Sequence, residues 1–173
     1  MGERADGDDL SAEYGRRRRE DDDAAAERRD VEWAATPWHS LVVGSCGHEV
    51  ELTLTTGSVV AGEVTDVGGS WCLVATGGSA VAVILEHVTS IRAPLRTTPP
   101  GRIQRPLGSV LRRWARMRGD VSLELADGTV CRGKVRHVLS DAVLVASDHD
   151  PVGRVIPLTA LISVRGPRLD PAD

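Results

Sequence analysis

Apolar and polar residues alternate along much of the chain, in short runs that end at glycine. The run EVELTLTTG, residues 49–57, places Val50, Leu52 and Leu54 on one face and mostly glutamate and threonine on the other. A period of two with one apolar face predicts a half-buried β-strand, and the glycine predicts a turn after it. Four further short runs complete a set of five strands, and a second set of five follows between residues 120 and 167.

Each strand set is preceded by a segment with helical spacing. In TPWHSLVVGSCG, Thr36 is placed as an N-cap and Pro37 as the first helical residue, which predicts a short helix to about Ser45. In PLGSVLRRWARMRG, apolar residues recur at helical spacing and the arginines fall mostly on the other face. Trp38 and Trp114 lie at helical spacing with other apolar residues, so we expect both in the core.

The two strand sets are copies of one module. LTTGSVVAGEV and LADGTVCRGKV stand 71 positions apart, and residues 48–76 align with residues 119–147 without a gap. The matching positions are apolar residues and glycines, where a shared backbone demands agreement. Gly62 and Gly133 interrupt the second strand of each set, where glycine permits the sharp bend of a small barrel. The predicted fold is all-β with short helices, as two tandem five-stranded barrels, each preceded by a short helix.

This order of elements, with a glycine turn followed by Gly-x-x-x-x-Gly-x-Val, resembles the Sm-like fold. The resemblance covers about residues 36–94 and 106–167, and the wider class of SH3-like barrels shares the strand order. It implies two Sm-like barrels whose open strand edges can pair with each other, with a protein partner or with another copy. Tandem barrels behind a charged tail also resemble small proteins of GC-rich bacteria, some of them described as transcriptional regulators. One lysine beside twenty arginines is consistent with such a genome.

The chain departs from the Sm pattern at its RNA-binding loops. Sm proteins that bind RNA typically carry Asp-x-hydrophobic-Asn between strands two and three, and Arg-Gly after strand four. Here the first motif is replaced by GSWC at residues 69–72 and by SDAV at residues 140–143, and Arg165-Gly166 comes only at the end of the fifth strand. The usual uridine site is therefore incomplete in both halves.

Composition sets the expected domain boundaries. Residues 1–32 include RRRREDDDAAAERRD, which buries too little apolar surface to offset chain entropy, so we expect a disordered tail with transient helix. The barrels then occupy residues 33–95 and 106–167. A proline-rich linker, residues 96–105, separates them, and residues 168–173 form a C-terminal tail.

Charge is distributed unevenly around a net value of −4. Residues 31–95 carry one basic and six acidic groups, whereas residues 96–173 carry thirteen and eight. A basic face of this kind is typical of a nucleic-acid surface. The candidate contact residues are Arg112, Arg113, Arg116, Arg118, Arg132, Lys134 and Arg136, with Trp71 at a loop–strand junction as a residue for stacking bases. Two alternatives are a solvated arginine face and a face that docks on the acidic first barrel through Glu49, Glu51 and Glu63.

Catalytic and metal-binding patterns are missing from the sequence. The three cysteines form no CxxC pair, which predicts buried thiols in a reducing compartment, and Cys46 and His48 lack the partners of a metal site. We therefore expect a cytoplasmic, non-enzymatic binding module without cofactor, metal, membrane or small-molecule substrate. Its predicted ligand is nucleic acid, RNA rather than DNA; the alternatives are a protein-interaction or scaffold module and a regulator of transcription.

Overall fold

The computed structural model describes residues 17–18, 23–28, 30–31, 33–94 and 105–169. The chain divides into two units, Met1–Pro37 and Trp38–Asp173. In the first unit most of the described residues are helical and exposed. The remainder of the expected tail, nearly all of the expected linker and residues 170–173 lie outside the described residues.

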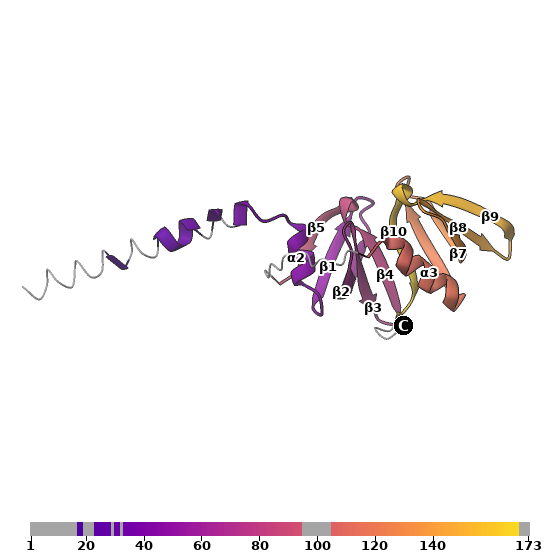
Figure 1. Ribbon diagram of the computed structural model, residues 1–173, viewed down its shortest axis with the longest axis horizontal. Coiled ribbons are helices and arrows are strands. Elements are labelled where there is room, and N and C mark those ends of the chain that lie inside the picture. The colour runs from indigo at the N-terminus through magenta and orange to yellow at the C-terminus, as the bar shows by residue number, and fades with distance from the viewer. Residues whose placement is uncertain (1–16, 19–22, 29, 32, 95–104, 170–173) are drawn as a thin grey trace, which may run out of the picture. The chain divides into compact units, whose positions relative to one another are not determined.

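The second unit contains both strand sets (Figure 1). The elements of the first half are α2 (His39–Gly44), β1 (Glu49–Leu54), β2 (Val59–Val67), β3 (Trp71–Thr76), β4 (Ser79–Ile84), the 3-10 turn η1 (Leu85–His87) and β5 (Val88–Arg92). Those of the second half are α3 (Leu107–Met117), β6 (Asp120–Leu125), β7 (Val130–Val138), β8 (Ala142–Ser147), β9 (Asp150–Pro157), η2 (Leu158–Ala160) and β10 (Leu161–Pro167). Each predicted strand is present.

One strand boundary differs from the prediction. The sequence predicts a loop over residues 148–153, because they contain aspartates, Pro151 and Gly153, but β9 already begins at Asp150. Strand β9 lies at the edge of the sheet and pairs only with β8. An edge strand tolerates proline because it loses no hydrogen bond on its open side.

The ten strands form one open antiparallel sheet in the order β5-β1-β2-β3-β4-β10-β6-β7-β8-β9. The expectation of two tandem five-stranded barrels is not confirmed, because the sheet is open. Pairing between strand edges of the two halves is present, since β10 pairs with β4 and joins them. That pairing runs from Ser163 opposite Val83 to Pro167 opposite Ser79. The fold is therefore mainly β, with one continuous sheet.

The duplication is visible in the register of the strands. Val50 lies opposite Gly62 in the first half, and Val121 lies opposite Gly133 in the second, each shifted by 71 positions. The pairings of β2 with β1 and with β3 all repeat in this way, including the register shift that bends the second strand. Both halves therefore have the same backbone plan.

The mid-strand glycines are required by a close approach of the next strand. A Cβ atom on Gly62 would lie 2.0 Å from the carbonyl oxygen of Ala75, and one on Gly133 would lie 2.4 Å from that of Ala146. Gly62 also has a φ of +155°. Only glycine fits where two backbones come this close.

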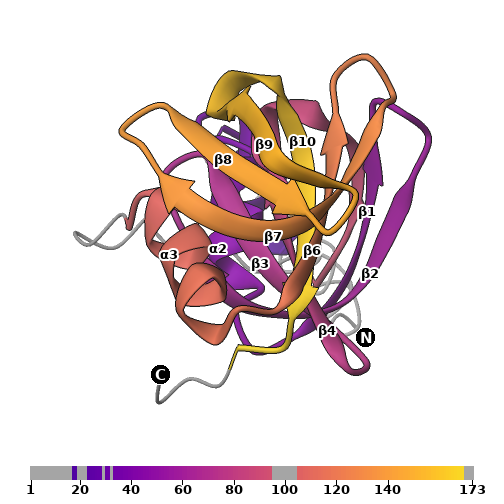
Figure 2. The same ribbon diagram turned by 90° about the vertical axis from the view of Figure 1, so that its right-hand side faces the viewer.

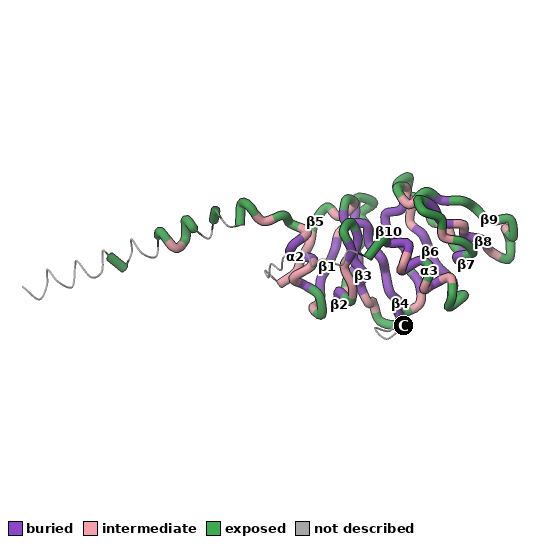
Figure 3. Tube along the Cα trace, viewed as in Figure 1, coloured by how far each residue is buried: buried purple, intermediate pink, exposed green. Residues whose placement is uncertain are grey.

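Two apolar clusters build the core, and they meet at the junction of the halves, where β4 pairs with β10. Most of β4 is buried, as Figure 3 shows. The first-half cluster contains Val81 and Val83 from one face of β4, together with Ile162 from β10. The second-half cluster contains Ala80, Ala82 and Ile84 from the other face of β4. Strand β4 is therefore buried on both faces, and each half completes the core of the other.

The two helices contribute unequally to these clusters. Helix α3 packs against β7 (Figure 2), and its Trp114 is fully buried with Nε1 donating to the Pro167 carbonyl at 2.9 Å. The core position predicted for Trp114 is confirmed. The same prediction for Trp38 is wrong, because its side chain is 43% exposed just before the six-residue α2. A helix this short cannot carry apolar residues over two turns.

A polar contact also crosses the junction. The carboxylate of Glu124 on β6 accepts hydrogen bonds from Thr56 and Ser58 in the β1–β2 turn, both at 2.6 Å to Oε1. Ser163 on β10 donates to Oε2 at 2.9 Å. Burial alone would raise the pKa of Glu124, but the three hydroxyl donors outweigh it and the pKa lies below its usual range.

Candidate anion-binding groove

The exposed faces of β2 and β7 occupy equivalent positions and carry different charge. Side chains two apart on a strand point to the same side of the sheet, so alternate residues of each strand form one face. The first half has no cation in this row, whereas the second half has three. The equivalent positions are Ala61 and Arg132, Glu63 and Lys134, and Thr65 and Arg136.

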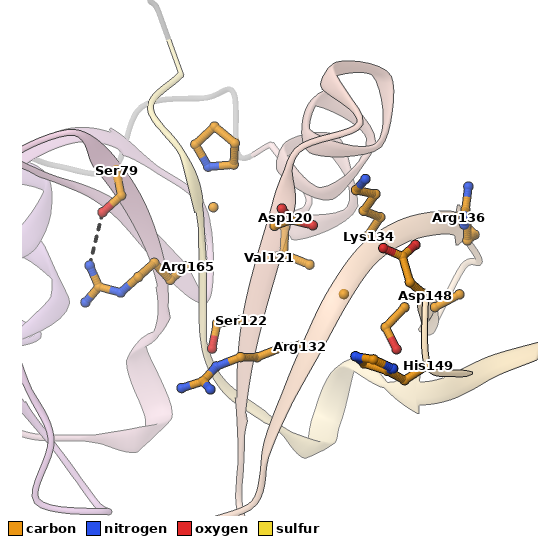
Figure 4. A pocket seen from close by; sticks show the side chains of 15 residues that line it. Ser79, Asp120, Val121, Ser122, Arg132, Lys134, Arg136, Asp148, His149 and Arg165 are labelled. Atoms are coloured by element: carbon orange, nitrogen blue, oxygen red, sulfur yellow. Dashed lines mark hydrogen bonds between the residues drawn. The ribbon is translucent and has the colours of Figure 1, made fainter. Parts of the chain in front are cut away.

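The three cations of β7 line one open groove with a volume of about 640 Å³. Strands β6, β7 and β10 contribute most of its lining, together with the turn from β8 to β9 and the start of β4. Figure 4 shows Arg132, Lys134 and Arg136 on the neighbouring positions of β7, with Asp148 and His149 on the turn beside them. The structure thus brings together the strand residues that the sequence singled out.

The groove contains a fourth cation, which sequence reasoning did not select. Arg165 on β10 lies opposite Ser122 on β6, and Ser122 in turn lies opposite Arg132 on β7. Its Nη1 donates to Thr76 Oγ1 at 3.0 Å and to Ser79 Oγ at 3.1 Å. The signal available in the sequence was the alternation of Ser163, Arg165 and Pro167, which places Arg165 on the exposed face of its strand.

Cations outnumber carboxylates in the groove. Its lining includes Asp120 and Asp148 beside the three cations of β7 and Arg165. Within the described part of the chain, none of these four cations forms an ion pair. The groove therefore has uncompensated positive charge, which favours an anionic ligand.

The arginines of α3 do not belong to the groove. Arg112, Arg116 and Arg118 are exposed, Arg113 is half-buried, and none of the four lines the groove. Arg118 ends the helix in the left-handed conformation, with a φ of 52°. The predicted contact residues therefore separate into a strand set inside the groove and a helix set outside it.

The position of Trp71 contradicts the prediction that its ring is exposed for stacking on a base. Its ring is only 1% exposed, and its Nε1 donates to the Arg105 carbonyl at 2.9 Å. A buried ring cannot stack on a base, so the expectation of an exposed Trp71 is wrong. The reason is that β3 is covered on its second face by the apolar cluster that includes α3.

Two of the three cysteines, Cys72 and Cys46, lack the character of nucleophiles. Burial raises the pKa of Cys72 to about 12. Cys46 is exposed, so the prediction of a buried thiol is wrong there; partial desolvation, followed by the charge of Asp66, raises its pKa. Since the thiolate is the reactive form, both thiols are poor nucleophiles at neutral pH.

Metal-binding clusters and membrane-spanning helices are both absent from the described residues. No group of three or more His, Cys, Asp or Glu side chains is placed to hold a metal ion there. Among the same residues, no helix combines the length and apolar character needed to cross a membrane.

No protein-family model and no curated protein matches this chain.

Proposed function

We propose that this chain is a non-enzymatic module that binds single-stranded nucleic acid through the groove of β6, β7 and β10. Each half is taken as one Sm-like unit, on the resemblance of its sequence, and the same resemblance favours RNA over DNA. The row of cations on β7 and the single cation Arg165 on β10 are separated by two strand spacings, about 10 Å. A groove of this width matches the backbone of one strand.

The observation that carries the proposal is the accessibility of the groove cations. Arg132 and Arg136 are exposed, and Lys134 is half-buried on the groove floor. Docking of this face on the acidic first half would have placed the β7 cations against Glu49, Glu51 and Glu63. No ion pair of that kind occurs among the described residues.

The composition of the groove favours phosphates over bases as the contacts. The imidazole of His149 is the only ring among the side chains that line it, apart from the proline ring of Pro167. Without aromatic stacking, affinity comes from neutralised phosphates and falls steeply as salt rises. We therefore expect weak dependence on base sequence.

A fluorescence-anisotropy titration tests the proposal. Labelled single-stranded oligouridine is titrated with the full chain at low and at physiological salt, with single-stranded and duplex DNA in parallel. The triple variant R132Q/K134Q/R136Q is expected to bind at least about tenfold more weakly. The matched control R112Q/R116Q/R118Q removes as much charge from α3 and is expected to change affinity by less than about threefold.

Three results would contradict the proposal. The first is the absence of salt-dependent binding by the wild-type chain to any of these nucleic acids. The second is an equal loss in the groove variant and in the α3 control. The third is a preference for duplex DNA, which would instead support the alternative of a transcriptional regulator.

A second candidate function is self-association through strand edges, and the open sheet favours it. Strands β5 and β9 each have one partner, and β9 exposes Val152 by 85% and Val155 by 61%. Unpaired edges with exposed apolar side chains are sites of pairing with another chain. Sedimentation velocity over a range of concentrations tests this: V152K/V155K is expected to shift an oligomer to monomer, and a wild-type chain that stays monomeric would exclude it.

A further inference from the structure

We propose that Arg165 and Arg132 bind phosphates of the bound strand from opposite sides of Ser122, and that Thr76 and Ser79 of the first half position Arg165 for this contact. This inference rests on the proposed function and names the atoms that would take the ligand. It also makes the groove a property of the joined halves, since the second half alone lacks the hydroxyls.

The strand register places the three residues in one row. Ser122 on the central strand β6 lies opposite Arg132 on one side and opposite Arg165 on the other. Neighbouring strands lie about 4.8 Å apart, so the two arginines stand about 10 Å apart on either side of Ser122. The hydrogen bonds of Arg165 hold its guanidinium toward β4, away from Ser122, so Arg165 takes a phosphate on that side of the groove and Arg132 takes one on the other side (Figure 4). Guanidinium groups are donors that a phosphate group prefers.

The first half has an equivalent row of three residues, but this row lacks the groups that would bind a phosphate. There Arg92 on β5 lies opposite Glu51 on β1, and the position equivalent to Arg132 is Ala61. A carboxylate in place of Ser122 repels a phosphate, and alanine supplies no donor. Strand β5 also lies at the sheet edge, so no strand beyond it provides hydroxyls for Arg92.

The hydroxyls on the first half restrict Arg165 without neutralising it. Thr76 and Ser79 are hydrogen-bonded to each other at 2.9 Å at the turn between β3 and β4, and both accept from Nη1 of Arg165 (Figure 4 shows the contact with Ser79). A guanidinium has five N–H donors, and Nη1 carries two of them. Hydroxyl partners are uncharged, so the positive charge remains available to a ligand while the side chain loses rotational freedom on folding rather than on binding.

A double-mutant cycle on the full chain, with oligouridine as the probe, tests the inference. R165Q is expected to weaken binding about tenfold and to lower the salt slope by about one. T76V/S79A keeps Arg165 but removes its partners, and is expected to weaken binding about threefold. Added to R165Q, T76V/S79A is expected to cause no further loss, because it acts through Arg165.

R92Q serves as the matched control, because it removes the same charge at the equivalent position of the first half. It is expected to change affinity by less than about twofold. Equal effects of R92Q and R165Q would overturn the phosphate subsite even though the wild-type chain binds RNA. A loss from T76V/S79A that persists in the R165Q background would overturn the positioning role, whereas failure of the wild-type chain to bind would overturn the proposed function itself.

Discussion

The two halves of this molecule share a backbone and differ in surface. Val50 and Gly62 pair in the first half as Val121 and Gly133 pair in the second. At exposed positions of the same strands the residue types diverge, as at Ala61 and its equivalent Arg132. Burial and close approach constrain a residue through packing, whereas an exposed side chain is free to change charge at little cost in stability. A duplicated fold can therefore keep its core and develop a groove in one half only.

The halves also differ in how their helices contribute to the core, and this difference predicts the largest effect on stability. Trp114 of α3 is fully buried, whereas Val43, its equivalent in α2, is half-buried. W114A should lower the free energy of unfolding by about 4 kcal/mol and V43A by about 1 kcal/mol. Chemical denaturation measures both, and equal losses would show that the two helices are equivalent after all.

The mid-strand glycines predict the next largest effect, and here the halves should behave alike. G62A and G133A each force a Cβ atom into a backbone carbonyl, which should cost about 2–3 kcal/mol, more at Gly62 because of its φ. G78A is the control, since a Cβ atom there would meet nothing within 4 Å. Thermal unfolding of the three variants checks this. A neutral G133A would mean that the second half bends differently.

The junction strand predicts an asymmetry between two equivalent residues. Ile162 on β10 is 1% exposed in the first-half core, while its equivalent on the free edge, Thr89, is exposed and donates to the Thr53 carbonyl at 3.1 Å. I162T should lower the free energy of unfolding by about 2 kcal/mol, because it removes buried apolar surface and buries a hydroxyl. T89I should change it by less than about 0.5 kcal/mol. Denaturant titration of both variants measures these changes. A small loss of unfolding free energy in I162T would show that the junction is loosely packed.

Glu124 predicts the smallest effect, which depends on pH. Its folded pKa lies below its unfolded value, so its contribution is fully present above the unfolded pKa and is lost as pH falls through the folded pKa. E124Q should therefore destabilise the chain by about 1 kcal/mol at neutral pH and by less in acid. The measurement is the free energy of unfolding of both proteins from neutral to acidic pH. A constant difference across that range would assign the effect to something other than ionisation.

The strands, the repeat and the shared face of the β7 cations could be predicted from the sequence, because they follow from the local alternation of residues and from the positions of glycine. The sequence was not sufficient for the single sheet or for the burial of Trp71, which depend on how one half covers the other. A signal for that cover was present: β3 and β4 are apolar on both faces, as WCLVA and AVAVI, where a half-buried strand would alternate. Arg165 was missed because its role depends on hydroxyls 86 and 89 residues away.

The most direct test of the contrast between the halves is an amide chemical-shift map of the chain titrated with single-stranded oligouridine. Chemical-shift changes are expected at Ser122, along residues 132–136 and in residues 147–149, with none at the equivalent positions of β1 and β2. Changes confined to the first half or to α3, or an unchanged spectrum at saturating oligonucleotide, would contradict the groove as the binding site.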